Sequence, residues 1–147
     1  MKNTTLIILI LFLYSCGYSS IYKNQTSQNF KINIIEKKGN SEMNNLIKNE
    51  IKLYSVKNTT NIYNLKIDTD YKKEILTKDS AGIITDYKLS VTSIFRVDLK
   101  GVTKVIELKE TINIKNQSDS FEQNTYEKNI KRSFASSIRE KLISEIL

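Results

Sequence analysis

Residues 87–114 read YKLSVTSIFRVDLKGVTKVIELKETINI, and this stretch decides the fold. Each half alternates between two sets of side chains, which is the pattern of a strand with one buried face. The predicted buried face carries Tyr87, Leu89, Val91, Ser93, Phe95 and Val97, then Ile106, Leu108, Glu110, Ile112 and Ile114. Residues 98–101 separate the halves, and Gly101 can adopt the positive φ that a tight turn requires. The sequence therefore predicts two antiparallel strands joined as a hairpin.

Two further strands are predicted ahead of this hairpin. Residues 30–36 alternate apolar with polar side chains over the length of one strand. Residues 63–71 do the same, with Tyr63, Leu65, Ile67, Thr69 and Tyr71 on one face. A loop at residues 78–82 joins this second strand to the hairpin.

Two amphipathic helices complete the prediction. Asn40 or Ser41 can cap a helix that runs to about Ser55, because apolar residues follow at three- and four-residue spacing. Residues 121–147 carry an apolar residue at every fourth position, which favours a long helix lying on a sheet. The order β-α-β-β-β-α predicts an α+β fold at residues 30–147, a single domain with a four-stranded, mostly antiparallel sheet and both helices on one face.

The N-terminus has the layout of a signal peptide. Lys2 precedes an uninterrupted apolar run at residues 6–13. This run is too short for a spanning helix, which needs about 20 apolar residues. Residues 1–15 are therefore expected to be a cleaved targeting segment, and residues 16–29, which are polar, the lipidated N-terminus and a tether.

The motif Leu13-Tyr14-Ser15-Cys16 resembles the bacterial lipobox. The resemblance implies signal-peptidase cleavage between Ser15 and Cys16, a diacylglycerol on the sulfur of Cys16 and an acyl chain on its freed amine. Two or more chains anchor a protein stably to a membrane. Gly17 rather than Asp after the cysteine points to a periplasm-facing position at the outer membrane. An ordinary secretory signal and an uncleaved short anchor are the alternatives.

Composition argues against an enzyme. The chain has no His and one Cys, so the commonest general base and any multi-cysteine metal site are missing. Asp68 and Asp70 share one strand face, as an acid/base pair would, but no partner His, Cys or Gly-rich loop accompanies them. We expect no catalytic residue, no metal and no cofactor other than the lipid on Cys16.

The net charge of +7 leaves two interpretations of the basic residues. They can serve an anionic partner, or they can reflect a general bias of the sequence toward Lys, Asn and Ile. Nucleic acid is not expected as the partner, because a signal peptide exports the chain.

The whole pattern resembles the lipopolysaccharide-assembly lipoprotein family (LptE). The resemblance rests on Cys16-Gly17-Tyr18, the strand at residues 30–36, the helix containing Leu46-Ile47-Lys48-Asn49-Glu50-Ile51, residues 81–87 and the helix at residues 126–147. It implies a lipoprotein that helps a translocon barrel in the outer membrane to assemble, plugs its lumen and contributes to the delivery of lipopolysaccharide (LPS) to the outer leaflet. The implied partners are that barrel, which is LptD-like, LPS and the membrane.

Basic residues are the candidate LPS contacts, because Lys and Arg donate charge-assisted hydrogen bonds to phosphate. We expect Lys72, Lys73 and Lys78 to form the best cluster, in the loop between the second and third strands. Arg96 and Lys100, near the next turn, are the second choice. The alternative function is another outer-membrane assembly lipoprotein, either an accessory subunit of the β-barrel insertion machinery or a secretin pilot.

Overall fold

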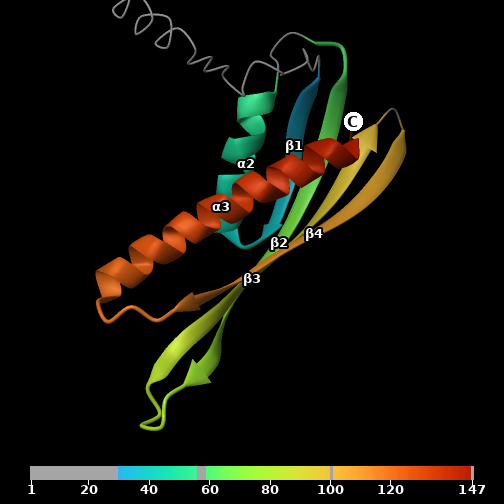
Figure 1. The fold of residues 1–147 in the computed structure, drawn as a ribbon. Coiled ribbons are helices and arrows are strands. Elements are labelled where there is room, and N and C mark those ends of the chain that lie inside the picture. Colours follow the sequence, from blue (N-terminus) through green and yellow to red (C-terminus); the bar gives the residue numbers. More distant parts are fainter. Residues whose placement is uncertain (1–29, 56–58, 100, 147) are drawn as a thin grey trace, which may run out of the picture.

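A computed structural model describes residues 30–55, 59–99 and 101–146 (Figure 1). The predictions for residues 1–29, including the cleavage after Ser15 and the lipid on Cys16, lie outside the described residues, as does Lys100. The elements are β1 (Lys31–Gly39), α2 (Ser41–Tyr54), β2 (Ile62–Lys78), β3 (Ile84–Leu99), β4 (Val102–Lys115) and α3 (Ser120–Ile146). The predicted order β-α-β-β-β-α is confirmed.

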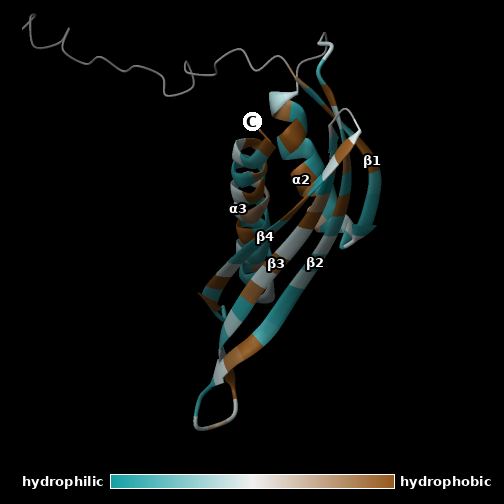
Figure 2. Cartoon of the chain, turned by 90° about the vertical axis from the view of Figure 1, so that its right-hand side faces the viewer, coloured by the Kyte–Doolittle hydropathy of each residue, from teal (hydrophilic) through white to brown (hydrophobic). Residues whose placement is uncertain are grey.

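The four strands form one sheet in the order β1-β2-β3-β4. The pairs β2–β3 and β3–β4 are antiparallel, whereas β1 pairs with β2 in parallel because α2 carries the chain back between them. Both helices pack on the same face of the sheet and leave the other face uncovered (Figure 2). This is the predicted α+β architecture, with its mostly antiparallel sheet.

The passage from β1 to α2 is unusually tight. Gly39 has a φ of 78°, and a Cβ at this position would lie 2.1 Å from the carbonyl oxygen of Thr69. The next residue, Asn40, donates its backbone N–H to that same oxygen at 2.6 Å. Asn40 is also the helix cap, since its Oδ1 accepts a hydrogen bond from the N–H of Met43 at 2.9 Å. A glycine is therefore required exactly where the chain turns into the helix.

The core lies between the helices and the predicted inner faces of the strands. Its fully buried side chains include Met43, Ile47, Leu65, Ile67, Leu89, Val91, Phe95, Ile138 and Leu142. The stripe predicted for the C-terminal helix is buried at Phe134, Ile138 and Leu142 but not at Tyr126, which is 39% exposed. Tyr126 lies in the first turns of α3, which reach beyond the sheet (Figure 1).

The strands β2 and β3 are longer than the sequence pattern predicts. They pair from Asn64–Asp98 to Lys78–Ile84 and extend past both helices as a projecting hairpin (Figure 1). The prediction that Lys72, Lys73 and Lys78 lie in a loop is wrong, because all three belong to β2. Beyond the cover of the helices a strand has no buried face, so its sequence loses the alternation that would reveal it.

Candidate binding surface

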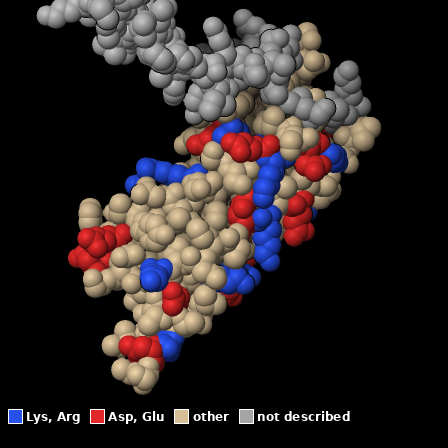
Figure 3. Space-filling model, in the orientation of Figure 1, with Lys and Arg blue, Asp and Glu red and all other residues tan. Residues whose placement is uncertain are grey.

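The uncovered side of the sheet is a candidate surface, and we call it the open face. It carries mainly polar and charged side chains because no helix shields it from water, together with the exposed Ile62 and Val105. The charged members described on it are Lys31, Glu36, Lys38, Lys66, Asp68, Asp70, Lys72, Glu74, Asp86, Lys88, Arg96, Asp98, Glu107, Lys109 and Lys115. Acidic and basic groups are interspersed, and the helix-bearing side seen in Figure 3 is mixed in the same way.

Arg96 lies on the open face next to a second basic residue. It is opposite Lys66 in the β2–β3 register, and both line a hollow of 250 Å³ together with Lys38, Glu36 and Asp68. Glu36 accepts from Lys66 at 3.1 Å and from Lys38 at 3.0 Å. Hydrogen bonds from these two ammonium groups hold the pKa of Glu36 below its usual value. Within the described residues Arg96 makes no ion pair.

Two cations placed directly opposite on neighbouring strands destabilise a sheet unless an anion lies near them. Glu36 neutralises part of the charge beside Lys66, and Arg96 keeps its guanidinium donors available. A guanidinium can bind one phosphate through two parallel hydrogen bonds. The surroundings of Arg96 and Lys66 are therefore a candidate anion site on the open face, although the carboxylates of Glu36 and Asp68 also line it.

Lys72 belongs to a second hollow farther along the same face. This hollow of 180 Å³ is also lined by Asp70, Glu74, Lys88 and Lys109. Lys72 forms an ion pair of 3.2 Å with Asp70, and both side chains are more than half exposed. An ion pair this exposed contributes little to stability, so Lys72 can exchange its partner for a ligand at low cost.

Lys73 points to the opposite side of the sheet from Lys72, because neighbouring residues of a strand alternate faces. Its ammonium lies 2.8 Å from Oε2 of Glu127 on α3 and 4.4 Å from the centre of the Tyr87 ring. The predicted cluster of Lys72, Lys73 and Lys78 is therefore divided, and Lys73 has a structural role under the helix.

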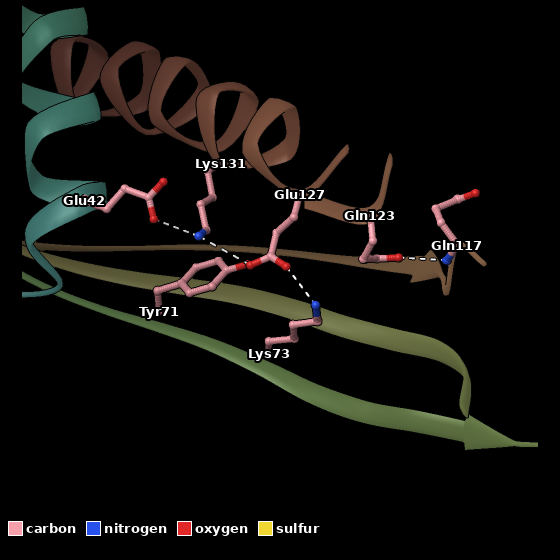
Figure 4. A network of polar contacts seen from close by, with 7 residues as sticks. All are labelled: Glu42, Tyr71, Lys73, Gln117, Gln123, Glu127 and Lys131. Atoms are coloured by element: carbon pink, nitrogen blue, oxygen red, sulfur yellow. Dashed lines mark hydrogen bonds and ion pairs between the residues drawn. The ribbon is translucent and has the colours of Figure 1, made fainter. Parts of the chain in front are cut away.

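Glu127 is the centre of a network that joins β2 to both helices (Figure 4). Tyr71 donates its hydroxyl to Oε1 of Glu127 at 2.9 Å, and Lys131 lies 3.3 Å from the same oxygen. Lys131 also contacts Glu42 of α2 at 2.8 Å and lies 4.6 Å from the centre of the Tyr71 ring. One lysine of α3 thus joins an acid of α2 to an acid of its own helix.

The network shifts the pKa values of its members. Burial raises the pKa of Glu127, but the hydrogen bonds from Lys73 and Tyr71 outweigh it, so the pKa lies below its usual value. Burial and the hydrogen bond to Glu127 raise the pKa of Tyr71 well above its usual value. For Lys131, burial alone would lower the pKa, but Glu42 and Glu127 raise it overall. Glu127, Tyr71 and Lys131 therefore keep their ordinary charges near neutral pH.

Lys78 is at the far end of β2, close to the tip of the projecting hairpin. The tip is shaped by Asp79, whose Oδ1 accepts the N–H groups of Ala81 at 2.9 Å and Ile83 at 2.8 Å. Ile83 is 62% exposed, and Ile75 on β2 is 51% exposed. Lys72 and Lys78 stand at the two ends of the exposed part of β2, residues 72–78, so they do not form one cluster.

Sequence reasoning missed the residues that lie near Arg96 and Lys72 in space. Lys66 and Lys38 accompany Arg96, while Lys88 and Lys109 accompany Lys72. The register of the predicted hairpin could have placed Lys109 opposite Thr92, because both strands were recognised. The sequence gives no local signal for the register between β1 and β2, because the register of two parallel strands depends on the helix that connects them.

Two kinds of feature do not occur in the part of the chain that the structure describes. No group of three or more acidic, His or Cys side chains there could hold a metal ion. Among those same residues, no helix combines the length and the apolar character needed to cross a membrane.

The same arrangement of helices and strands is found in solved lipoproteins. Rare lipoprotein B from Shewanella oneidensis has a TM-score of 0.58 at 11% identity, and the match covers 78% of this chain and 93% of that one. A minor lipoprotein from Acinetobacter baumannii has a TM-score of 0.54 at 13% identity, with 80% and 94% of the two chains covered. This chain has the fold of these lipoproteins. No family model matches its sequence, and no curated protein does.

A third structure shows the same fold. Lipoprotein B from Nitrosomonas europaea, solved in solution, has a TM-score of 0.52 at 13% identity and covers 77% of this chain and 82% of its own. Identities this low establish a shared architecture only. Each match includes more than four-fifths of the other chain.

Proposed function

We propose that this chain is an outer-membrane lipoprotein that helps assemble and plugs the LPS translocon barrel and contributes to LPS delivery to the outer leaflet. The observation that carries the proposal is the lipoprotein fold of residues 30–146 in a chain whose one cysteine, Cys16, directly follows an apolar run and a small residue. The resemblance of the sequence to the LptE family supplies the specific role.

The surface chemistry supports a plug. The lumen of a large outer-membrane barrel is polar, so a domain inside it needs a polar surface on every side. The open face offers such a surface without a covering helix, and its charges of both signs can pair with polar groups of a barrel wall.

The LPS role is assigned to the basic residues of the open face. Arg96 with Lys66 forms the first anion site, and Lys72 with Lys88 and Lys109 forms the second. Lys78 remains a candidate at the hairpin tip, whereas Lys73 is already engaged by Glu127. Lys66→Glu combined with Arg96→Glu should weaken LPS binding in low salt. The control is Lys128→Glu, which changes an exposed lysine of α3 and should leave LPS binding unchanged.

Purification from membranes in detergent is the deciding experiment. The proposal predicts that the chain copurifies at equal stoichiometry with a large barrel protein, and that its depletion leaves the barrel misassembled and LPS in the periplasm. Intact LPS display in depleted cells would contradict it. Copurification with the β-barrel insertion machinery or with a secretin would assign the chain to one of those assemblies instead.

The anchor is tested separately. Cys16→Ser should abolish incorporation of labelled palmitate and release the chain to the soluble periplasmic fraction. Continued membrane retention of this variant without palmitate would show that the N-terminal segment anchors the chain by another means.

A further inference from the structure

β1 is an edge strand of the sheet in the part of the chain that the structure describes, and it forms a groove with α2. The groove has a volume of 500 Å³ and lies on the helix-bearing side of the edge. Its floor is apolar and consists of Ile32 and Ile34 from β1 and Ile51 from α2. Ile32 and Ile51 are buried, and Ile34 is partly exposed.

The backbone of β1 is open toward this groove. Ile32 donates its N–H to Oγ of Ser55 at 3.2 Å, so its polar backbone groups point away from β2. Backbone groups of alternate residues in a strand point to the same side, and Ile34 therefore directs its N–H and C=O outward as well. Ser55 occupies one end of the groove, and the bulge between Ile34 and Glu36 interrupts the edge at the other. A short segment of two or three residues can pair there.

The rim of the groove is basic. Lys48 and Lys52 of α2 line it on the helix-bearing side, Lys31 of β1 lines it from the opposite face of the edge, and no acidic side chain lines it. Lys48, Ile51 and Lys52 lie on one side of the helix because they are three and four residues apart. Among the described residues these three lysines make no ion pair, whereas Lys38, Lys66, Lys72 and Lys73 all do.

We propose that this groove binds an extended, acidic peptide segment of a partner protein, which adds to β1 as a further strand. Main-chain hydrogen bonds to Ile34 supply pairing. Side chains of the added strand that face α2 meet the isoleucine floor, with Lys48 and Lys52 at its rim, and the intervening side chains lie toward Lys31. Carboxylates are the expected complement because three cations stand around the edge without a counter-charge. The lysines and the bulge also discourage the β1 edges of two copies of this chain from pairing with each other. A partner strand at this edge must therefore carry negative charge that offsets the lysines. The inference does not depend on the proposed function.

The test uses the full chain in detergent and a labelled nine-residue peptide of alternating Glu and Val. Fluorescence anisotropy should detect binding that weakens with added salt, and the amide signal of Ile34 should shift in the NMR spectrum. Lys48→Glu with Lys52→Glu should weaken binding by about fivefold or more, from the usual strength of exposed charge pairs. Lys128→Glu, on the exposed side of α3, should leave binding unchanged.

Two further peptides separate strand addition from simple charge attraction. A peptide in which Lys replaces Glu should not bind, and a peptide with N-methylated backbone amides should bind far more weakly. Equal binding of the N-methylated peptide, or no effect of Lys48→Glu with Lys52→Glu, would overturn the proposal. Failure of the peptide to bind, while phosphatidylglycerol micelles bind through the same lysines, would assign the groove to an anionic lipid and overturn it as well.

Discussion

The hydroxyl of Tyr71 on β2 donates a hydrogen bond of 2.9 Å to Oε1 of Glu127 on α3, across 56 positions of sequence. Lys73 and Lys131 bind the same carboxylate, and Lys131 continues to Glu42 on α2. The long helix is therefore attached to the sheet by polar contacts at the point where the hydrophobic core ends. Beyond it the hairpin of β2 and β3 has no helix to pack against.

Glu127→Gln should destabilise the fold by about 1–3 kcal/mol, because it leaves two lysines without their shared anion. The Glu127 side chain is only 14% exposed, so water replaces the lost contacts poorly. Urea denaturation measures the free energy of unfolding. Glu107→Gln, at an exposed position of β4, is the control and should change it by less than about 0.5 kcal/mol.

Lys72→Glu and Lys73→Glu should differ sharply although the residues are neighbours. Lys73→Glu places a second carboxylate beside Glu127 and should cost about 1–3 kcal/mol of stability. Lys72→Glu replaces an exposed lysine and should cost about 1 kcal/mol at most. Equal losses from the two substitutions in thermal or urea unfolding would contradict the assignment of Lys73 to the helix-bearing side.

Stability should fall in acid. The pKa of Glu127 is lowered in the folded chain, so its contribution is complete above the unfolded value of about 4.3. That contribution is lost as the pH falls through the lower, folded pKa, because the unfolded chain then binds more protons. The urea midpoint of the natural chain should therefore decrease more between pH 6 and pH 3 than that of Glu127→Gln. A parallel decrease in both proteins would rule out this role.

Stability should also fall in alkali. The pKa of Tyr71 is raised by burial and by Glu127, so the folded chain keeps its proton when the unfolded chain loses it. The pH dependence of this contribution is therefore opposite to that of Glu127. The stability decreases as the pH rises past about 10, which is the ordinary pKa of tyrosine. Tyr71→Phe should reduce this loss in unfolding experiments between pH 8 and pH 11. An unchanged slope would show that other groups cause it.

Gly39→Ala should be the most harmful glycine substitution among the described residues. The new Cβ would overlap the carbonyl of Thr69, at 2.1 Å, in addition to the strain of a positive φ. Gly101→Ala has a similar φ of 87° but no atom within 4 Å, so it should show only the strain, about 1 kcal/mol. Comparison of the two free energies of unfolding isolates the contact with Thr69, and equal values would exclude it.

The sequence by itself determined the order of elements, the buried faces of the strands and the position of the helix cap. Alternation at Tyr87–Val97 and the four-residue repeat at Phe134, Ile138 and Leu142 are local signals, because burial of one face selects apolar residues at the period of the element. The same reasoning placed Asn40 or Ser41 at the start of α2, and the structure selects Asn40.

Tertiary structure alone decided which side chains meet. Arg96 lies opposite Lys66, and Lys73 pairs with Glu127, although the two residues of each pair are distant in sequence. These contacts depend on strand register, on the parallel crossover and on the angle of α3, which are set by packing of the whole core. Charged residues on a surface carry no periodic signal of their partners, so the candidate site required the three-dimensional arrangement.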